Sequence, residues 1–388
     1  MKIKEISVVQ IDFPAVKEEP RSGRRPWGES AEVANPVSRY PKLKPHRSLW
    51  RPKWEPSYCK VTAEDGTWGL GKLAFTEPGV PVVEHLAQHL IGEDCMAIEK
   101  LADLMFRLTK PYGSVGLASY AISAIDLALW DLKGKILGQP VYSLIGGPQK
   151  DKIFCYCTGN DVDWYMEEGF RAFKLACPYG PADGLDGLLK NEEFVAKARE
   201  TIGDDKELML DCWMAFDVEY TVRLAEILRP YRVYWLEECL IPEDFDGHVR
   251  LRQRLPWQTL TTGEHWYTHY PFQWAIQNKV VDILQPDIVW CGGITTCRRI
   301  HDAADAAGIH VILHAGGTTI YGQHFSYAMP SVPWLECVVS APPGAQGRLS
   351  IPGQAQPSDG WLVPSDAPGF GLEVSENELK PVSKPVSN

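Results

Sequence analysis

Six ionisable side chains follow short apolar runs at a nearly constant interval in the second half of the sequence. Successive intervals are 26, 27, 23, 27 and 22 residues, and the six are Asp211, Glu237, Glu264, Asp287, His314 and Glu336. A closed α/β barrel divides about 250 residues among eight strand–helix units, so one unit takes about this length. One charge after a strand is ordinary, often a helix N-cap. Six ionisable residues that recur once per unit, each after a strand, predict a barrel mouth that carries an active site.

Three of the six, Asp211, Glu237 and Glu264, are carboxylates from successive units. Without a cation they would repel one another and raise each other's pKa. A hard divalent ion removes this conflict, and oxygen ligands favour Mg²⁺ or Mn²⁺ over Zn²⁺. Glu238 is either a salt-bridged neighbour or a further ligand, and His265 is either a substrate or outer-shell contact or a packing residue. The pattern predicts a metal centre formed by the three carboxylates.

His314 and Asp287 come from neighbouring units and predict an acid–base pair. A carboxylate bonded to one imidazole nitrogen fixes the tautomer and makes the other nitrogen a better base. A base opposite a metal-bound carboxylate indicates proton abstraction from the adjacent carbon, with the metal stabilising the ene-diolate. Glu336, on the opposite rim, would hydrogen-bond the ene-diolate if it is protonated.

Alternating apolar strands and amphipathic helices from residue 151 onward are expected to position these residues. The expected strands are Lys152–Cys157, Ala172–Leu175, Glu207–Leu210, Val233–Leu236, Thr259–Thr262, Val281–Leu284, His310–Leu313 and Trp334–Val338. The expected helices are Asn191–Thr201, Val218–Leu228, Asp244–Arg254, Pro271–Gln277 and Thr295–Ala307. Eight such units in under 200 residues favour a closed parallel barrel. An open doubly wound sheet is the alternative, but no GxGxxG follows a strand.

Residues 1–150 have a different pattern, typical of an α+β module. Strands are expected at Ile3–Phe13 and Ser57–Thr62, and helical spacing of apolar residues predicts a helix over Ala118–Lys135. The long segment Val16–Pro56 between the two strands is rich in Pro, Arg and Trp, and a loop of this length is usually functional or disordered. We expect it to close over the barrel mouth. The predicted domains are 1–150, a barrel over 151–341, and a tail over 342–388 that packs back on the first module.

The composition limits the class of protein further. The chain has 388 residues, 45% hydrophobic and 23% charged, with a net charge of −11. The only basic run is Arg21–Arg25, which argues against a nucleic-acid partner. No run of 18 apolar residues and no signal-peptide core exist, so a cytoplasmic protein is expected. Ten cysteines without a CxxC pair predict reduced, buried thiols, with a thiolate metal site or a catalytic thiol as the alternative.

The helix Ala121–Lys135, followed by Leu144-Ile145-Gly146-Gly147, resembles a motif of the enolase superfamily, specifically of its mandelate racemase branch. The resemblance extends over essentially the whole chain. It implies a modified TIM-type (β/α)7β barrel with an α+β capping domain, formed by the N-terminal region and the C-terminal tail.

Within that branch the sequence is similar to the L-rhamnonate dehydratases. The similar stretches are Leu210–Met214, Glu237–Leu240, Gly263–His265, Gln285–Asp287 and Trp290–Thr296. This resemblance implies a hydro-lyase that converts an aldonic acid to its 2-keto-3-deoxy product. It also implies one Mg²⁺ per subunit, for which Mn²⁺ can substitute, and a homo-oligomer.

The resemblance assigns roles position by position. The residues that match the metal ligands are Asp211, Glu237 and Glu264. Those that match the catalytic histidine, its orienting partner and the ene-diolate stabiliser are His314, Asp287 and Glu336. The substrate-binding candidates are Arg47 from the capping loop, Glu336, Lys174 and His265.

Two departures from the family pattern bear on the reaction. Racemases of the branch have a Lys-x-Lys pair on the second strand, whereas this chain has Lys174 followed by Ala176. Elimination by one base is therefore favoured over racemisation by two. A substrate-binding histidine of the rhamnonate dehydratases is absent from the capping loop, which reads Arg25-Pro26-Trp27-Gly28-Glu29-Ser30 here. L-Lyxonate and L-mannonate therefore stay open as substrates beside L-rhamnonate.

Two other functions were weighed against the dehydratase. A non-catalytic metabolite-binding protein of this fold is expected to lack His314 or a metal ligand, and this chain keeps all of them. An epimerase or cycloisomerase would need a base on the second strand, where Ala176 stands.

Overall fold

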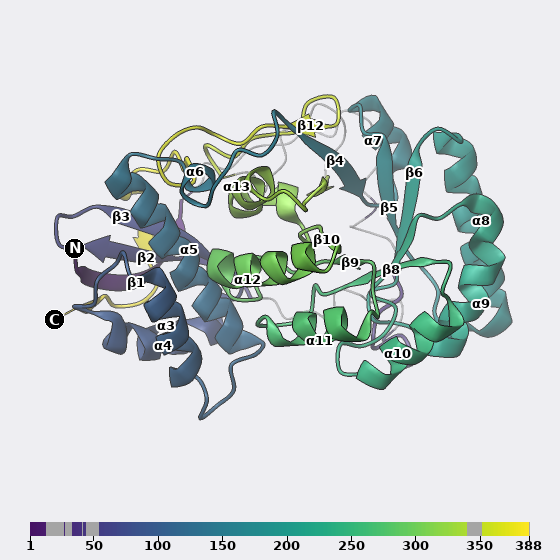
Figure 1. The fold of residues 1–388 in the computed structure, drawn as a ribbon, viewed down its shortest axis with the longest axis horizontal. Helices are drawn as coiled ribbons and strands as arrows, with labels where there is room; N and C mark the ends of the chain where they lie inside the picture. Colours follow the sequence, from purple (N-terminus) through teal and green to yellow (C-terminus); the bar gives the residue numbers. More distant parts are fainter. Residues whose placement is uncertain (13–26, 28–32, 41, 44–53, 340–350, 388) are drawn as a thin grey trace.

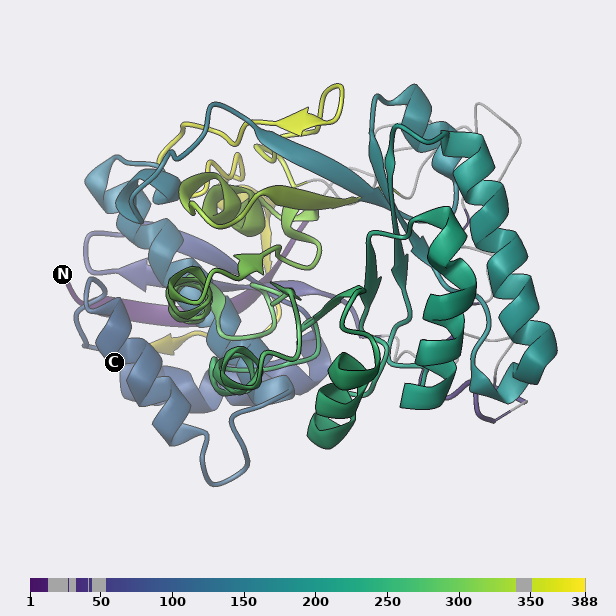
Figure 2. The ribbon, with the colours of Figure 1, turned by 45° about the vertical axis from the view of Figure 1, so that its right-hand side comes forward.

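The computed structural model describes residues 1–12, 27, 33–40, 42–43, 54–339 and 351–387 (Figure 1). Arg47 and most of the predicted lid segment lie outside the described residues. Two units stand side by side, an N-terminal layer of sheet and helices and a curled parallel sheet flanked by helices (Figures 1 and 2). This arrangement confirms the predicted capped α/β barrel.

The capping sheet contains both ends of the chain. Its antiparallel strands are β1 (Ile3–Ile11), β2 (Ser57–Ala63), β3 (Trp68–Leu73), β13 (Leu379–Pro381) and β14 (Val386–Ser387). Strand β1 pairs with β2, and also with β13 and β14 from the tail. The tail thus returns to the N-terminal module, as predicted. The domain boundaries themselves stay a prediction.

Strand β3 was missing from the sequence analysis, because two glycines interrupt its apolar pattern. The sheet lies directly against the long helix α5 (Leu117–Leu137). A Cβ atom at Gly69 would stand 2.1 Å from the carbonyl oxygen of Ala128, and one at Gly71 would stand 1.9 Å from that of Ala124. Close approach of sheet and helix therefore requires glycine at both positions. The other capping helices are α3 (Thr76–Leu90), α4 (Ile98–Leu108) and α6 (Val141–Leu144).

Eight parallel strands form the barrel sheet. In chain order they are β4 (Ile153–Thr158), β5 (Ala172–Ala176), β6 (Glu207–Asp211), β7 (Trp235–Glu237), β8 (Thr259–Thr262), β9 (Ile283–Leu284), β10 (His310–Val311) and β11 (Trp334–Val338). Their order in the sheet is β10-β9-β8-β7-β6-β5-β4-β11. The short strand β12 (Trp361–Leu362) adds to β4 in the antiparallel direction. Each strand from β4 to β9 thus pairs with the next one in the chain, and β11 pairs with β4.

Seven helices alternate with these strands within residues 153–338, giving the (β/α)7β pattern. They are α7 (Val162–Glu167), α8 (Gly184–Ile202), α9 (Val218–Leu228), α10 (Phe245–Arg254), α11 (Tyr270–Asn278), α12 (Gly293–Ala306) and α13 (Ile320–Ala328). Most predicted bounds differ from these by a few residues. Strand β9 begins two residues later than predicted and ends at Leu284 as predicted, ahead of Pro286, which has no N–H to continue the ladder. No helix among the described residues is long and apolar enough to span a membrane.

The barrel interior is filled by one apolar layer. It consists of Tyr156, Ala172, Met209, Trp235, Ile283 and Ile312, with Phe154 and Trp334 packed against it. Each of the six comes from a different strand or strand end. All ten cysteines are free and buried, which confirms that they act as small core residues.

Candidate active site

The polar residues of the site lie two positions after the residues of the apolar layer. Side chains alternate along a strand, so residues two apart point to the same face. The inward residue after each layer residue therefore points toward the barrel mouth. These residues are Thr158, Lys174, Asp211, Glu237, Gln285, His314 and Glu336. One strand period thus places a charged layer directly above an apolar one.

Lys174 is the central cation of this charged layer. Its Nζ contacts Oε1 of Glu237 directly, lies 2.7 Å from Oε1 of Glu336 and 3.7 Å from Oδ2 of Asp211. The lysine side chain is only 1% exposed. Burial alone would lower the pKa of Lys174, but the surrounding carboxylates outweigh it and raise that pKa well above its usual range. Lys174 is thus held as an ammonium ion that joins β5, β7 and β11.

Glu237 is surrounded by hydrogen-bond donors. Besides the Lys174 contact, its Oε2 accepts hydrogen bonds from Nε2 of Gln285 at 2.7 Å and Nε1 of Trp235 at 3.0 Å. Burial and the charges of Asp211 and Glu336 still raise the pKa of Glu237, against the effect of Lys174. A carboxylate oxygen has about two lone-pair directions, so Glu237 keeps acceptor capacity for a further ligand.

His314 and Asp287 form the predicted pair. The Nδ1 of His314 lies 2.7 Å from Oδ2 of Asp287, whose Oδ1 accepts the backbone N–H of Val289 at 2.7 Å. The second imidazole nitrogen, Nε2, lies 3.2 Å from Oε1 of Glu264. Burial would lower the pKa of His314, but Glu264, Asp287 and Glu336 together raise it to about 10. The imidazole therefore bridges its orienting partner and the carboxylate cluster.

Glu336 is held as an ionised acceptor in this structure. It accepts hydrogen bonds from the Thr158 hydroxyl and, at 2.6 Å, from the backbone N–H of Ala315. Burial would raise the pKa of Glu336, but the positive charges of Lys174 and His314 lower it to about 2. The expected hydrogen bond from Glu336 to the ene-diolate requires a protonated carboxyl group. In this structure the oxygens of Glu336 instead face hydrogen-bond donors and cations.

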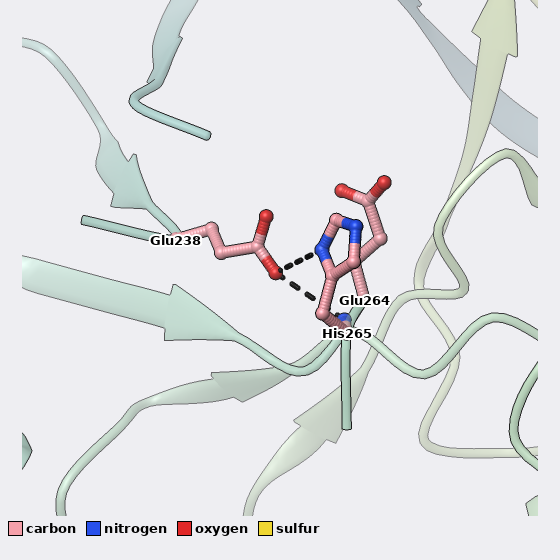
Figure 3. A group of neighbouring side chains, drawn as sticks. All are labelled: Glu238, Glu264 and His265. Carbon is pink, nitrogen blue, oxygen red and sulfur yellow. Dashed lines mark hydrogen bonds and ion pairs between the residues drawn. The ribbon is translucent and has the colours of Figure 1, made fainter. Parts of the chain in front are cut away.

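Figure 3 shows Glu238, Glu264 and His265, whose potential ligand atoms all lie within 4.8 Å of one another. Glu238 follows β7 with a left-handed backbone (φ 47°), and its Oε1 lies 2.8 Å from Nδ1 of His265. Burial would lower the pKa of His265, but Glu238 and Glu264 raise it to about 9. The other oxygen of Glu238 is buried without a hydrogen-bond partner. Glu238 thus forms a salt bridge with His265 through Oε1, while its Oε2 has no hydrogen-bond partner.

Asp211 and Glu237 do not join that group. Within the part of the chain that the structure describes, no compact triad of Asp211, Glu237 and Glu264 meets the same 4.8 Å limit. Lys174 instead lies against Asp211 and Glu237, while His314 lies against Glu264. Mutual repulsion favours this arrangement, in which each carboxylate lies against a cation and not against another carboxylate.

Among the described residues at the mouth, carboxylates outnumber the basic side chains that contact them. The carboxylates are Asp211, Glu237, Glu238, Glu264, Asp287 and Glu336, and the basic side chains that contact them are Lys174, His265 and His314. Within the part of the chain that the structure describes, six carboxylates thus face three basic side chains that contact them. Burial together with neighbouring carboxylates raises the pKa of Asp211 and of Glu264. An excess of buried carboxylate oxygens fits a hard divalent cation.

Described parts of the capping loop reach the mouth. The N–H of Ala34 donates to the carbonyl of Cys177 at 2.8 Å, and that of Trp27 donates to Oδ2 of Asp161 at 2.8 Å. Val33 packs with Ala176 in an apolar cluster. Trp27, Val33 and Ala34 therefore lie against the ends of β4 and β5.

Sequence reasoning did not single out Gln285 and Thr158, and it left Glu238 open between a salt-bridged neighbour and a metal ligand. Gln285 and Thr158 could have been found by counting two residues beyond the inward apolar residue of each strand. Glu238 could not, because its direction depends on a left-handed turn that no pattern of apolar residues reports.

Comparison with known proteins agrees with the fold. Residues 53–146 match the family model of the mandelate racemase / muconate lactonizing enzyme N-terminal domain, and residues 160–378 match the enolase C-terminal domain-like model. The chain therefore belongs to the enolase superfamily, in the mandelate racemase / muconate lactonizing enzyme family.

Two relatives with similar names extend this result. The chain is 42% identical to L-rhamnonate dehydratase from Saccharopolyspora erythraea over 90% of its own length and 91% of that protein. The crystal structure of L-rhamnonate dehydratase from Gibberella zeae matches with a TM-score of 0.90 and 34% identity, covering 98% of this chain and 96% of the other. A second structure of the Gibberella enzyme, complexed with Mg, matches with a TM-score of 0.89, 34% identity and the same coverage.

Proposed function

We propose that this protein is a Mg²⁺-dependent sugar-acid dehydratase, a hydro-lyase that acts on L-rhamnonate. The observation that carries the proposal is the His314–Asp287 pair, whose second imidazole nitrogen, Nε2, faces the carboxylate cluster at Glu264. The similarity to L-rhamnonate dehydratases over nine-tenths of the chain supports the substrate class. The product is the corresponding 2-keto-3-deoxy acid.

Asp211, Glu237 and Glu264 are the proposed ligands of one Mg²⁺ per subunit, with Mn²⁺ as a substitute. The ion supplies a Lewis acid for the substrate carboxylate and stabilises negative charge that develops on its oxygens. All three side chains come from successive strand ends, and the imidazole of His265 is a poor ligand for Mg²⁺. Glu238 and His265 then serve as neighbours, with His265 available to the substrate.

His314 removes the proton from C2 of the acid through Nε2. Asp287 accepts a hydrogen bond from the Nδ1–H of the imidazole. This bond fixes the tautomer and stabilises the imidazolium that forms. Neutral His314 requires that the charge on Glu264 be offset, because Glu264 is the carboxylate that contacts Nε2. The ammonium of Lys174 lies in the same layer and offers positive charge to the ene-diolate.

The same imidazolium then protonates the hydroxyl that leaves from C3. The C2–H and C3–O bonds break, the C2–C3 double bond forms, and water departs; the enol then becomes the ketone. Ala176 stands where a second base would be needed, so one group acts in both steps and H and OH leave from the same face. Glu336 holds Lys174 and the His314 segment in place through its contacts with Lys174 and Ala315.

Further assignments belong to the same proposal. Arg47 binds the substrate from the lid, the domains divide at 150 and 341, and the enzyme acts in the cytoplasm as a homo-oligomer. No macromolecular partner other than further copies of the chain is invoked.

A panel of aldonic acids tests the proposed function. The purified protein with Mg²⁺ should form a 2-keto-3-deoxy acid from L-rhamnonate, detected as the semicarbazone or by NMR. Removal of metal with EDTA should abolish the reaction, and Mg²⁺ should restore it. No keto-acid formation from any acid of the panel would contradict the proposal.

A further inference from the structure

One wall of the barrel mouth is apolar. Val33, Ala176, Trp213 and Met214 form a separate hydrophobic cluster, 3% to 8% exposed, with Trp27 packed against it. We call these four residues the apolar wall. The layer beside the apolar wall consists of polar and charged side chains. The wall therefore differs from the rest of the mouth, which suggests that it has a role in binding.

The position of Ala176 shows that the wall borders the reaction site. Ala176 pairs with Asp211 in the parallel ladder and lies two residues after Lys174 on β5. Since side chains two apart share a face, Ala176 points inward above the Lys174 ammonium. Ala176 thus presents only a methyl group to the mouth, beside Trp213 and Met214.

The backbone of Trp213 and Met214 is strained to build this wall. Both residues have positive φ, 41° and 59°, a backbone conformation that is unfavourable for residues other than glycine. The N–H of Trp213 donates to Oδ1 of Asp211 at 2.9 Å, and that of Met214 donates to the Glu238 carbonyl at 2.6 Å. These bonds fold the chain over the end of β6 and fix the two side chains at the mouth.

The wall lies across the mouth from the proposed base. His314 follows β10, and the sheet order β10-β9-β8-β7-β6 places β6 four strands away, half-way round an eight-stranded barrel. The mouth thus has a proton-transferring side and an apolar side. Val33 contributes from the capping loop, which the Ala34–Cys177 hydrogen bond ties to the end of β5.

We propose that the apolar wall receives the terminal methyl group of the substrate, so that Val33 and Met214 select 6-deoxy acids. The inference rests on the proposed function. An aldonic acid normally carries a hydroxyl on every carbon beyond C1, and burial of a hydroxyl without a partner is unfavourable. L-Rhamnonate ends in a methyl at C6, L-mannonate has the same configuration with a hydroxyl there, and L-lyxonate lacks C6. The wall offers apolar side chains and matches the first of these.

The ratio of kcat/KM for L-rhamnonate to that for L-mannonate tests the proposal. An apolar pocket rejects an added hydroxyl by no more than about 100-fold, so the wild-type ratio should lie between about 10 and 100. Val33→Thr and Met214→Gln introduce polar atoms with little change of shape. Each should reduce the ratio about tenfold, chiefly by lowering kcat/KM for L-rhamnonate. Val80→Thr, the same substitution in capping helix α3, is the matched control and should leave the ratio unchanged.

The outcomes separate the two proposals. If the wild type dehydrates both acids equally well, or if both variants retain the wild-type ratio, the wall does not contact C6 and the inference is overturned. A uniform loss for both acids would likewise mark the wall as mere packing between lid and barrel, and overturn it. Failure of the wild type on every acid would overturn the proposed function, and this inference with it. Val33→Thr is the milder change and keeps the test available if Met214→Gln does not fold.

Discussion

The ammonium of Lys174 and the carboxylate of Glu336 form an ion pair of 2.7 Å in which both side chains are 1% exposed. The pair joins β5 to β11 across β4, directly above the apolar layer of the barrel. Lys174 also contacts Glu237 and approaches Asp211. A single lysine thus compensates carboxylates from three strands, and the metal-free site depends on it.

Replacement of Lys174 by Met should destabilise the metal-free protein. Removing one partner of a buried ion pair leaves an uncompensated charge and costs about 3–5 kcal/mol. Urea denaturation in EDTA measures the loss. Lys100→Met removes an exposed pair with Glu93 and should cost less than about 1 kcal/mol. Equal stability losses in the two variants would show that the Lys174 network contributes no more than a surface pair.

Mg²⁺ should bind more tightly as the pH rises. Burial and neighbouring carboxylates raise the pKa of Asp211, of Glu264 and, to about 8, of Glu237. With a pKa of about 8, Glu237 holds a proton near neutral pH, and a metal ion must displace it. Calorimetric titrations from about pH 6 to about pH 8 should show rising affinity and proton release. An affinity that does not change with pH would argue against carboxylates with raised pKa as ligands.

Two substitutions distinguish the proposed ligand set from the group in Figure 3. Asp211→Asn should weaken Mg²⁺ binding by more than the roughly 10–100-fold that loss of an outer-shell partner costs. His265→Asn should leave it within about tenfold of wild type, because imidazole is not a preferred Mg²⁺ ligand. The reverse pattern, with binding lost only in His265→Asn, would assign the ion to Glu238, Glu264 and His265 instead.

Asp287→Asn should lower kcat with little change in Mg²⁺ affinity. The amide can keep a contact with Nδ1 of His314 but favours the wrong tautomer, a change that costs about 10⁴-fold in a serine protease triad. Steady-state kinetics and calorimetry on the same preparation provide the comparison. Full activity in this variant would show that Asp287 does not orient the base.

Much of the site could be predicted from the sequence because its residues follow the two-residue alternation of side chains along a strand. Side chains alternate along strands, so a charge just past an apolar run points into the mouth, and recurrence at unit length revealed Asp211 and His314. The same rule applied two residues beyond Tyr156 and Ile283 would have added Thr158 and Gln285. These positions follow from local geometry alone.

Other features depend on tertiary contacts that no local pattern encodes. Strand β3 was missed because Gly69, which allows close packing against α5, interrupts the apolar alternation by which a strand is recognised. The direction of Glu238 depends on its positive φ, and the central place of Lys174 depends on carboxylates from strands far apart in the sequence. Sequence spacing brings such groups to the same rim but does not decide which cation each of them contacts.

Exchange of the C2 proton with solvent tests the central claim most directly. A substrate analogue without the 3-hydroxyl can lose its C2 proton but cannot eliminate water, so NMR in D₂O with Mg²⁺ follows abstraction alone. The wild type should exchange this proton. His314→Asn should reduce exchange by about 10²–10⁴-fold, and turnover by at least as much, while Mg²⁺ still binds, since general acid–base catalysis contributes about 10²–10⁴-fold per step. Exchange at the wild-type rate in His314→Asn would contradict the account, because another residue would then be the base.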